Sequence, residues 1–254
     1  MLTNTPFFLE GSEACSHACL LLHGLGGGVY EMQLLGAYLH QQGLTVRAIN
    51  YPGHDRPSFR MPASTWQQWY LHILETYLQL VRQYDRVSVV GFSTGCPLGL
   101  HLAVQHPIEK LVLLAPYMAI RRQLNDRIKP EVLLFSLGQV ISEVPRLRLP
   151  IRDRTMRQQA QQALFFRSFN LAAVRSANEL IALVKQELPG ITVPTLIMQA
   201  PGDTIVDPAG ATLIYDQLGS TEKTLIWLEQ SDHIIPLDLE RDRVFQEVGQ
   251  FLKN

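Results

Sequence analysis

The stretch RVSVVGFSTGCPLGL, residues 86–100, decides the fold. An apolar, β-branched run leads directly into Gly91-Phe92-Ser93-Thr94-Gly95, and helix-forming residues follow. Glycine weakens both strands and helices, and a hydroxyl at the end of a buried strand needs a partner, so this stretch serves something other than packing. We therefore expect a strand, a tight strained turn and a helix, with the Ser93 hydroxyl exposed by the turn at the carboxyl end of a sheet.

Further runs along the chain also read as strands. They are ACLLLHG (18–24), LTVRAIN (44–50), KLVLLAP (110–116), VPTLIMQA (193–200) and KTLIWLE (223–229). They are too continuously apolar for a sheet with one wet face, which favours parallel strands covered on both sides. A capping box at Ser64–Gln67 and apolar residues at helical spacing up to Val81 predict a helix against the sheet. The fold class is therefore α/β, a mostly parallel sheet with helices on both faces.

The alternation of strands and helices breaks after Pro116. Residues 117–190 contain no convincing strand, and helical stretches occur near 130–141, 153–169 and 173–188. This segment holds 12 basic and 6 acidic residues, whereas the rest of the chain holds 10 and 17. We expect an α-helical cap insertion at 117–190 within one core domain formed by 1–116 and 191–254.

Composition excludes several function classes. The 254 residues carry a formal net charge of −1, which gives no reason to expect a nucleic-acid partner. The three cysteines form neither a disulfide framework nor a metal-binding pattern, and we expect no metal or cofactor. The start of the chain lacks the features of a secretory signal, and no apolar run reaches the roughly 20 residues of a membrane-spanning helix. The simplest location is the cytoplasm.

Ser93 needs a base within hydrogen-bond reach and a carboxylate that orients the base. His233, in EQSDHIIPLD, follows the last predicted strand and precedes the last predicted helix, so it is the expected base. Asp203, in MQAPGDTIVDPAG, lies in a strand-end loop and is the expected acid. Asp207 precedes a proline and reads as a helix N-cap, whereas Asp232 is a weaker rival because neighbouring side chains in an extended loop diverge.

Acyl transfer also needs donors aimed at the developing oxyanion. LLHGLGGGVYE, residues 21–31, follows a predicted strand and has four glycines in the five positions 24–28, which keeps side chains away from backbone NH groups. The expected donors are the NH groups of Leu25 and Thr94. A phosphate-binding loop is the alternative, but neither complete glycine-rich nucleotide motif is present.

At this point the sequence resembles the α/β-hydrolase superfamily. HGLGG, YPGHD, GFSTG, GDTIVD and SDHIIPLD occur in the family's order. A small chain with G-x-S-x-G, a helical cap after the sixth family strand and DH followed by apolar residues resembles the bacterial carboxylesterases and monoacylglycerol lipases within that superfamily. The resemblance implies Ser93, Asp203 and His233 as a catalytic triad, Leu25 and Thr94 as oxyanion donors, and an acyl-enzyme intermediate. Asp55 departs from the family's usual P-G-H-G, with no role assigned, and the antiparallel start of the family's sheet is expected to be trimmed.

The insertion is expected to supply most of the substrate pocket. Together with Gly24, residues Phe135, Phe165 and Phe166, with Phe169 beside them, would line an acyl groove; the equal alternative is that these aromatic residues form the inner face of the cap helices. Arginines of the insertion are typical of solvated helix faces, and a second interpretation is weak attraction to an acidic substrate or an anionic membrane surface.

The predicted function is hydrolysis of small-molecule carboxylic esters with short to medium acyl chains, monoacylglycerols among them. The alternatives use the same triad on another bond, as in a C–C hydrolase of ring-cleavage products, a thioesterase, an amidase or an acyltransferase. A non-catalytic binding protein on this scaffold would usually show a broken triad.

Overall fold

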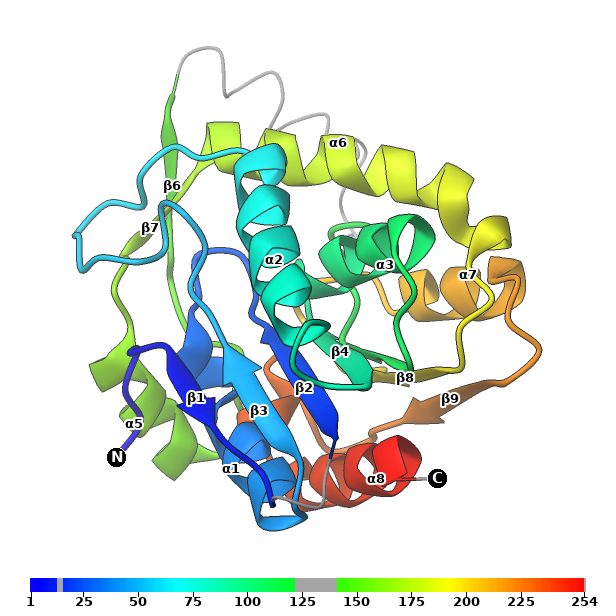
Figure 1. The fold of residues 1–254 in the computed structure, drawn as a ribbon. Helices are drawn as coiled ribbons and strands as arrows, with labels where there is room; N and C mark the ends of the chain where they lie inside the picture. Colours follow the sequence, from blue (N-terminus) through cyan, green and yellow to red (C-terminus); the bar gives the residue numbers. More distant parts are fainter. Residues whose placement is uncertain (13–15, 122–140, 254) are drawn as a thin grey trace.

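A seven-stranded sheet forms the centre of the molecule (Figure 1). The computed structural model describes residues 1–12, 16–121 and 141–253. The strand order is β1-β3-β2-β4-β5-β8-β9, and every pairing is parallel except that of β1 with β3. The strands are β1 (Phe7–Leu9), β2 (His17–Leu22), β3 (Thr45–Ala48), β4 (Arg86–Phe92), β5 (Leu111–Leu114), β8 (Thr195–Gln199) and β9 (Lys223–Trp227).

The six predicted strands are all present, and the mostly parallel α/β sheet is confirmed. The antiparallel start is reduced rather than lost. Phe7 pairs with Ala48 across the β1–β3 ladder, so one short strand of three residues remains at this edge.

Helices cover both faces of the sheet, as the apolar strands require. The helices are α1 (Gln33–Gln41), α2 (Trp66–Leu80), α3 (Gly95–Gln105), α5 (Arg154–Ala163), α6 (Leu171–Glu187), α7 (Ala209–Gln217) and α8 (Arg241–Lys253), with 3-10 turns at η1 (Val29–Glu31), η2 (Leu188–Gly190) and η3 (Ile235–Leu237). Successive β2 residues enter different cores: Leu20 and Leu22 pack under α2 and α3, whereas Cys19 and Leu21 pack under α1 and α8. None of the helices in the described ranges combines the length and apolar character needed to cross a membrane.

The α2 helix begins one residue later than predicted. Thr65 is the N-cap: its hydroxyl accepts the Gln68 NH, and the Gln68 side chain accepts the Thr65 NH. The Ser64 hydroxyl instead accepts a hydrogen bond from the buried Trp69 indole at 2.9 Å.

The chain between β5 and β8 departs from the prediction that it contains no strand. Two three-residue strands, β6 (Glu143–Pro145) and β7 (Ser168–Asn170), pair antiparallel in a two-stranded sheet apart from the main one, with α5 between them in the chain. Pairing with each other lets such short strands form without strand-like apolar runs. The structure does not describe residues 130–140 of the helix predicted near 130–141.

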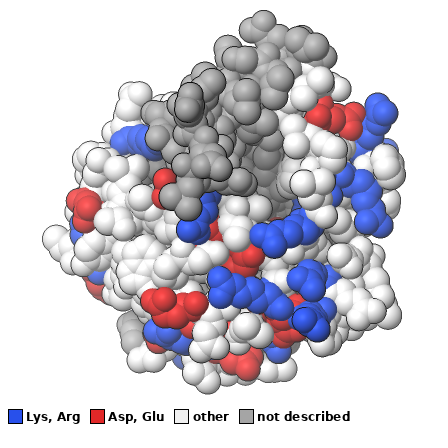
Figure 2. All heavy atoms as spheres, turned by 180° about the vertical axis from the view of Figure 1, so that it is seen from behind, with Lys and Arg blue, Asp and Glu red and all other residues white. Residues whose placement is uncertain are grey.

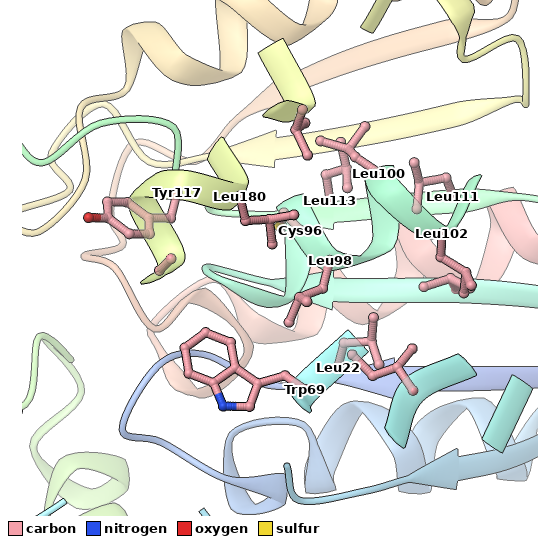
Figure 3. Packing of buried hydrophobic residues seen from close by; sticks show 14 of the residues in the cluster. Leu22, Trp69, Cys96, Leu98, Leu100, Leu102, Leu111, Leu113, Tyr117 and Leu180 are labelled. Atoms are coloured by element: carbon pink, nitrogen blue, oxygen red, sulfur yellow. The ribbon is translucent and has the colours of Figure 1, made fainter. Parts of the chain in front are cut away.

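Helix α6 shares the main core. Its buried face, which includes Leu180, joins the cluster that contains Leu22, Trp69 and Leu98 (Figure 3). It lies across α2 and α3 (Figure 1). This part of the insertion is therefore built into the molecule and is not a separate unit.

Candidate active site

Ser93 occupies a strained turn between β4 and α3. Its φ angle is 52°, in the left-handed region that non-glycine residues rarely adopt. A Cβ on Gly95 would collide with the Leu22 carbonyl, and one on Gly91 would collide with the Gly95 carbonyl. The glycines thus let the helix start directly against two strands, which places the Ser93 side chain at the carboxyl end of the sheet.

The three residues predicted to act together are brought together. Nε2 of His233 lies 2.9 Å from Oγ of Ser93, and Nδ1 of His233 lies 2.7 Å from Oδ2 of Asp203. Asp203 is fully buried, and the other two side chains are almost so. Asp203 Oδ1 also accepts the NH groups of Ile205 and Val206, at 2.8 and 2.9 Å, so the carboxylate is fixed by its own loop.

The electrostatics of the pair favour an ionised aspartate. Burial alone would raise the pKa of Asp203, but the His233 ring and the loop NH groups outweigh it and hold that pKa below its usual range. Burial alone would lower the pKa of His233, yet the Asp203 carboxylate raises it above 6.5. His233 can therefore accept a proton from Ser93 into a site that stabilises the imidazolium.

Asp232 and Asp207, the other two candidate carboxylates, make different contacts. Asp232 accepts the Thr204 NH at 2.9 Å and its hydroxyl at 2.8 Å, which ties the histidine loop to the aspartate loop. Asp207 accepts the Ala209 NH at 3.0 Å, as a residue at a helix start does, with α7 beginning at Ala209 and its N-cap at Pro208 rather than at Asp207.

The peptide between Gly24 and Leu25 has a fixed orientation. The Gly24 carbonyl accepts hydrogen bonds from His23 Nδ1 at 2.8 Å and from the Gly27 NH at 3.1 Å. Because a trans peptide directs its NH opposite to its carbonyl, the Leu25 NH is turned away from these donors. Within the described residues, neither the Leu25 NH nor the Thr94 NH has an acceptor, and both residues line the same cavity as Ser93.

Two buried histidines hold this loop from beneath. Burial lowers the pKa of His23 well below 6.5 and that of His54 to about 4, so both rings are neutral. His23 must carry its proton on Nδ1 to donate to Gly24, and His54 Nε2 accepts the Gly26 NH at 3.0 Å. His54 therefore contacts the glycine-rich loop directly.

Glu31 is a buried carboxyl that sequence reasoning missed. It follows the glycine-rich loop, lines the cavity beside Ser93, and its Oε2 accepts the Gly24 NH at 2.9 Å. Burial raises its pKa above the usual range. A glutamate in the first turn of a helix ordinarily suggests a solvated surface residue, and only the adjacent glycines signal that its side chain folds inward.

Asp238, whose carboxylate links two segments of the chain, was also missed in the sequence analysis. Its fully buried carboxylate accepts the NH groups of Arg152, Asp153 and Leu239 on one oxygen and that of Asp232 on the other, at 2.7–2.9 Å. It therefore joins the chain before α5 to the loop that carries His233.

A cavity of about 430 Å³ opens above Ser93. Its described wall is mainly aliphatic, with Leu25, Ile120, Val144, Leu171, Val174 and Val206, and it includes Gly24 as expected. Phe165 and Phe166 do not line it: Phe166 is fully buried against His54, and Phe165 packs on Phe166. Phe169 is the aromatic residue of that cluster that reaches the cavity, and Phe135 lies outside the described residues.

Asp55, the departure from the family pattern, lies outside the cavity lining. Its side chain is half exposed and lies 3.8 Å from Arg56. In the described parts of the chain no cluster of three or more histidine, cysteine or acidic side chains could hold a metal ion. On the face turned away in Figure 1, acidic side chains lie directly beside the basic ones (Figure 2), so this face is not uniformly basic.

Fold and site together define an α/β-hydrolase, and comparison with known proteins places it further. Residues 14–240 match the Hydrolase_4 family, described as serine aminopeptidase S33, and the chain belongs to this family. It is similar to a carboxylesterase of Bacillus subtilis, 28% identical over 100% of this chain and 98% of the relative. A thermostable monoacylglycerol lipase of Bacillus sp. is 26% identical over 97% and 93%. The solved structure of a monoglyceride lipase from Saccharomyces cerevisiae superposes with a TM-score of 0.83 at 16% identity, covering 97% of this chain and 90% of that one.

Proposed function

We propose that Ser93, His233 and Asp203 form the triad with which this protein cleaves carboxylic esters of short to medium acyl chains through an acyl-enzyme. The protein is an ester hydrolase of the serine type, in line with its family and with relatives named carboxylesterase and monoacylglycerol lipase. The single observation that carries the residue assignment is the hydrogen-bonded chain from Ser93 Oγ through His233 to Asp203 at the floor of the cavity.

The proposed reaction begins when Ser93 Oγ attacks the ester carbonyl. His233 Nε2 takes the hydroxyl proton and then donates it to the leaving alcohol, while Asp203 stabilises the imidazolium. The Leu25 and Thr94 NH groups, which have no acceptor among the described residues, bind the oxyanion. A water molecule that gives a proton to His233 then attacks the acyl carbonyl. The bond to Ser93 Oγ breaks, the carboxylic acid leaves, and His233 returns the proton to Ser93.

The aliphatic wall of the cavity supports an apolar acyl or alkyl chain as the group that is bound. A volume of about 430 Å³ lies in the range of small-molecule sites, which favours chains of modest length, monoacylglycerols included. In this proposal residues 117–190 act as the cap and contribute much of that wall, Val144, Leu171 and Val174 among them. Cytoplasmic location and weak contact of the cap with an anionic membrane stay predictions.

Hydrolysis of p-nitrophenyl esters from acetate to palmitate, by the wild type and by Ser93→Ala, tests the proposal. We expect an optimum at short to medium chains and loss of turnover by at least about a thousandfold in the variant. Ser220→Ala is the control, because it removes a hydroxyl that donates to the Glu222 carbonyl and does not line the cavity. No turnover of any ester by the wild type would contradict the proposal and favour another bond, such as a C–C bond.

A further inference from the structure

The two-stranded β6–β7 sheet contacts the glycine-rich loop at residues 24–28, which is the oxyanion loop of the proposed function. Val144 pairs with Phe169, and the Arg146 NH donates to the Arg167 carbonyl at 2.9 Å, which extends the ladder by one bond. This pairing places the Arg146 and Phe169 side chains together: the guanidinium carbon lies 4.3 Å from the centre of the Phe169 ring. The ring therefore gives Arg146 a stacked, fixed position.

From that position Arg146 reaches the glycine-rich loop. Its Nη2 donates to the Gly26 carbonyl at 2.7 Å, a short charge-assisted hydrogen bond. Gly26 has a φ of 64°, and a Cβ there would meet Arg146 Nη2 at 2.8 Å and Phe169 Cε1 at 2.9 Å. The β6–β7 sheet and the loop thus fit each other only because position 26 has no side chain.

The loop is held from the core side at neighbouring atoms. Glu31 accepts the Gly24 NH, and His54 accepts the Gly26 NH, so Leu25 lies between two fixed peptides. The Gly26 carbonyl is hydrogen-bonded as well, and its partner comes from the insertion rather than from the core. Interactions that hold an oxyanion donor within a fraction of an ångström affect the rate much more than substrate binding.

We propose that Arg146 is a positioning residue, by which the β6–β7 sheet of the insertion fixes the oxyanion loop and sets the direction of the Leu25 NH. The inference rests on the proposed function of this site. Arg146 does not act on the substrate itself in this account. It acts through the Gly26 carbonyl, so its loss raises the barrier for oxyanion formation and leaves ester binding nearly unchanged.

Kinetics of Arg146→Met test this role. The methionine keeps much of the apolar stem and removes every donor. We expect kcat to fall by about ten- to a hundredfold while KM changes by less than about threefold, because a misplaced donor weakens transition-state binding alone. Affinity for a trifluoromethyl ketone, whose serine adduct carries an oxyanion, should fall by the same factor as kcat. Arg146→Lys, which keeps one donor but not the stacked fork, should recover part of the loss.

The matched control is Arg60→Met. Arg60 is an exposed arginine 3.4 Å from Glu143 of the same two-stranded sheet, and the described residues show no contact between it and the oxyanion loop. We expect the kcat of this variant to stay within about twofold of the wild type. Thermal melting of each variant excludes unfolding as the cause. If Arg146→Met does not fold, Arg146→Lys carries the test, with the same split between kcat and KM.

Two results would overturn the inference. One is an unchanged kcat in a folded Arg146→Met enzyme. The other is a rise in KM confined to a substrate with a free carboxylate, mono-p-nitrophenyl succinate, with p-nitrophenyl butyrate unaffected, which would make Arg146 a binding group for anionic substrates. Either result, with an active wild type, leaves the proposed ester hydrolysis standing, whereas an inactive wild type would contradict the proposed function itself.

Discussion

Glu31 lines the same cavity as Ser93 and His233, and the proposed mechanism gives it no proton to transfer. Its carboxylate faces the Gly24 NH, the Tyr30 hydroxyl, Arg146 and His233. Its charge contributes to the raised pKa of His233, after the larger contribution of Asp203. At the scale of single residues, Glu31 therefore links loop geometry to the protonation of the base.

Replacement of Glu31 by glutamine should shift the pH dependence of activity. His233 acts as a base only when neutral, so kcat/KM falls as pH drops through the pKa of His233, which lies above 6.5 in the wild type. The Glu31→Gln change keeps an acceptor for the Gly24 NH and removes the charge, so the acid limb should move to lower pH. The pH profile of p-nitrophenyl ester hydrolysis measures it, with Glu75→Gln at an exposed helix position as the control. An unmoved limb would contradict the coupling of Glu31 to His233.

Site residues that belong to a recognisable motif could be predicted from the sequence, and site residues outside any motif could not. Ser93, Asp203 and His233 each follow an apolar strand, and strand ends of a parallel sheet converge, so their meeting could be predicted. Glu31 and Arg146 carry no such signal, because a glutamate in a first helical turn and an arginine among many in a basic segment ordinarily face water. Only the three-dimensional structure, with a guanidinium on Phe169 and a carboxylate on Gly24, separates them from solvated charges.

At the scale of elements, the Asp238 side chain joins the loop after β9 to the chain before α5. Asp238 collects four backbone NH groups from the chain before α5 and from the loop between β9 and α8. Because the carboxylate is fully buried, removing it leaves those donors without acceptors in a dry environment.

Asp238→Ala should therefore lower the free energy of unfolding by about 3 kcal/mol or more, and should also lower kcat because the His233 loop loosens. Urea unfolding and ester kinetics measure both effects. Asp207→Ala is the control: it removes an aspartate whose side chain accepts a single NH group at a helix start, so a loss of about 1 kcal/mol is expected. Equal losses in the two variants would argue against Asp238 as the junction of the two segments.

Element prediction succeeded for long apolar strands and failed for short ones. The β6 and β7 strands have three residues each, and Pro145 ends one of them, so neither shows an apolar run. Phe166 was expected in the pocket because it lies in an aromatic cluster of the insertion, but its ring packs edge-on against His54 in the core. The direction of these aromatic side chains depends on the path of the chain between α5 and β7, and the sequence pattern does not predict that path.

At the scale of the whole molecule, α6 belongs to the core under α2 and α3 although it lies in the insertion. In the sequence, residues 117–190 are distinguished from the rest of the chain by their charge and by their lack of predicted strands. Neither feature reports how the helices pack inside the molecule. The inner face of α6, with Leu180 fully buried, follows the same apolar rule as the core helices. The charge pattern therefore separates residues 117–190 from the rest of the chain, whereas the packing joins α6 to the core.

Leu180→Ala tests this shared core. We expect a loss of about 2–5 kcal/mol, the range for truncating a fully buried leucine, and a single unfolding transition followed both by tryptophan fluorescence and by circular dichroism. Leu71→Ala, at a side chain that is 63% exposed, should cost much less. A separate early transition in the Leu180 variant would indicate that α6 unfolds apart from the sheet.

The central claim, that Ser93 is the nucleophile activated by His233, is tested most directly by covalent labelling. The wild type is treated with a fluorophosphonate, which reacts with activated serines, and the adduct is located by peptide mass spectrometry. The account predicts one label per chain, on Ser93, appearing at the same rate as ester hydrolysis is lost, with no label in Ser93→Ala and much slower labelling in His233→Ala. A label on another residue, or full turnover in Ser93→Ala, would contradict it.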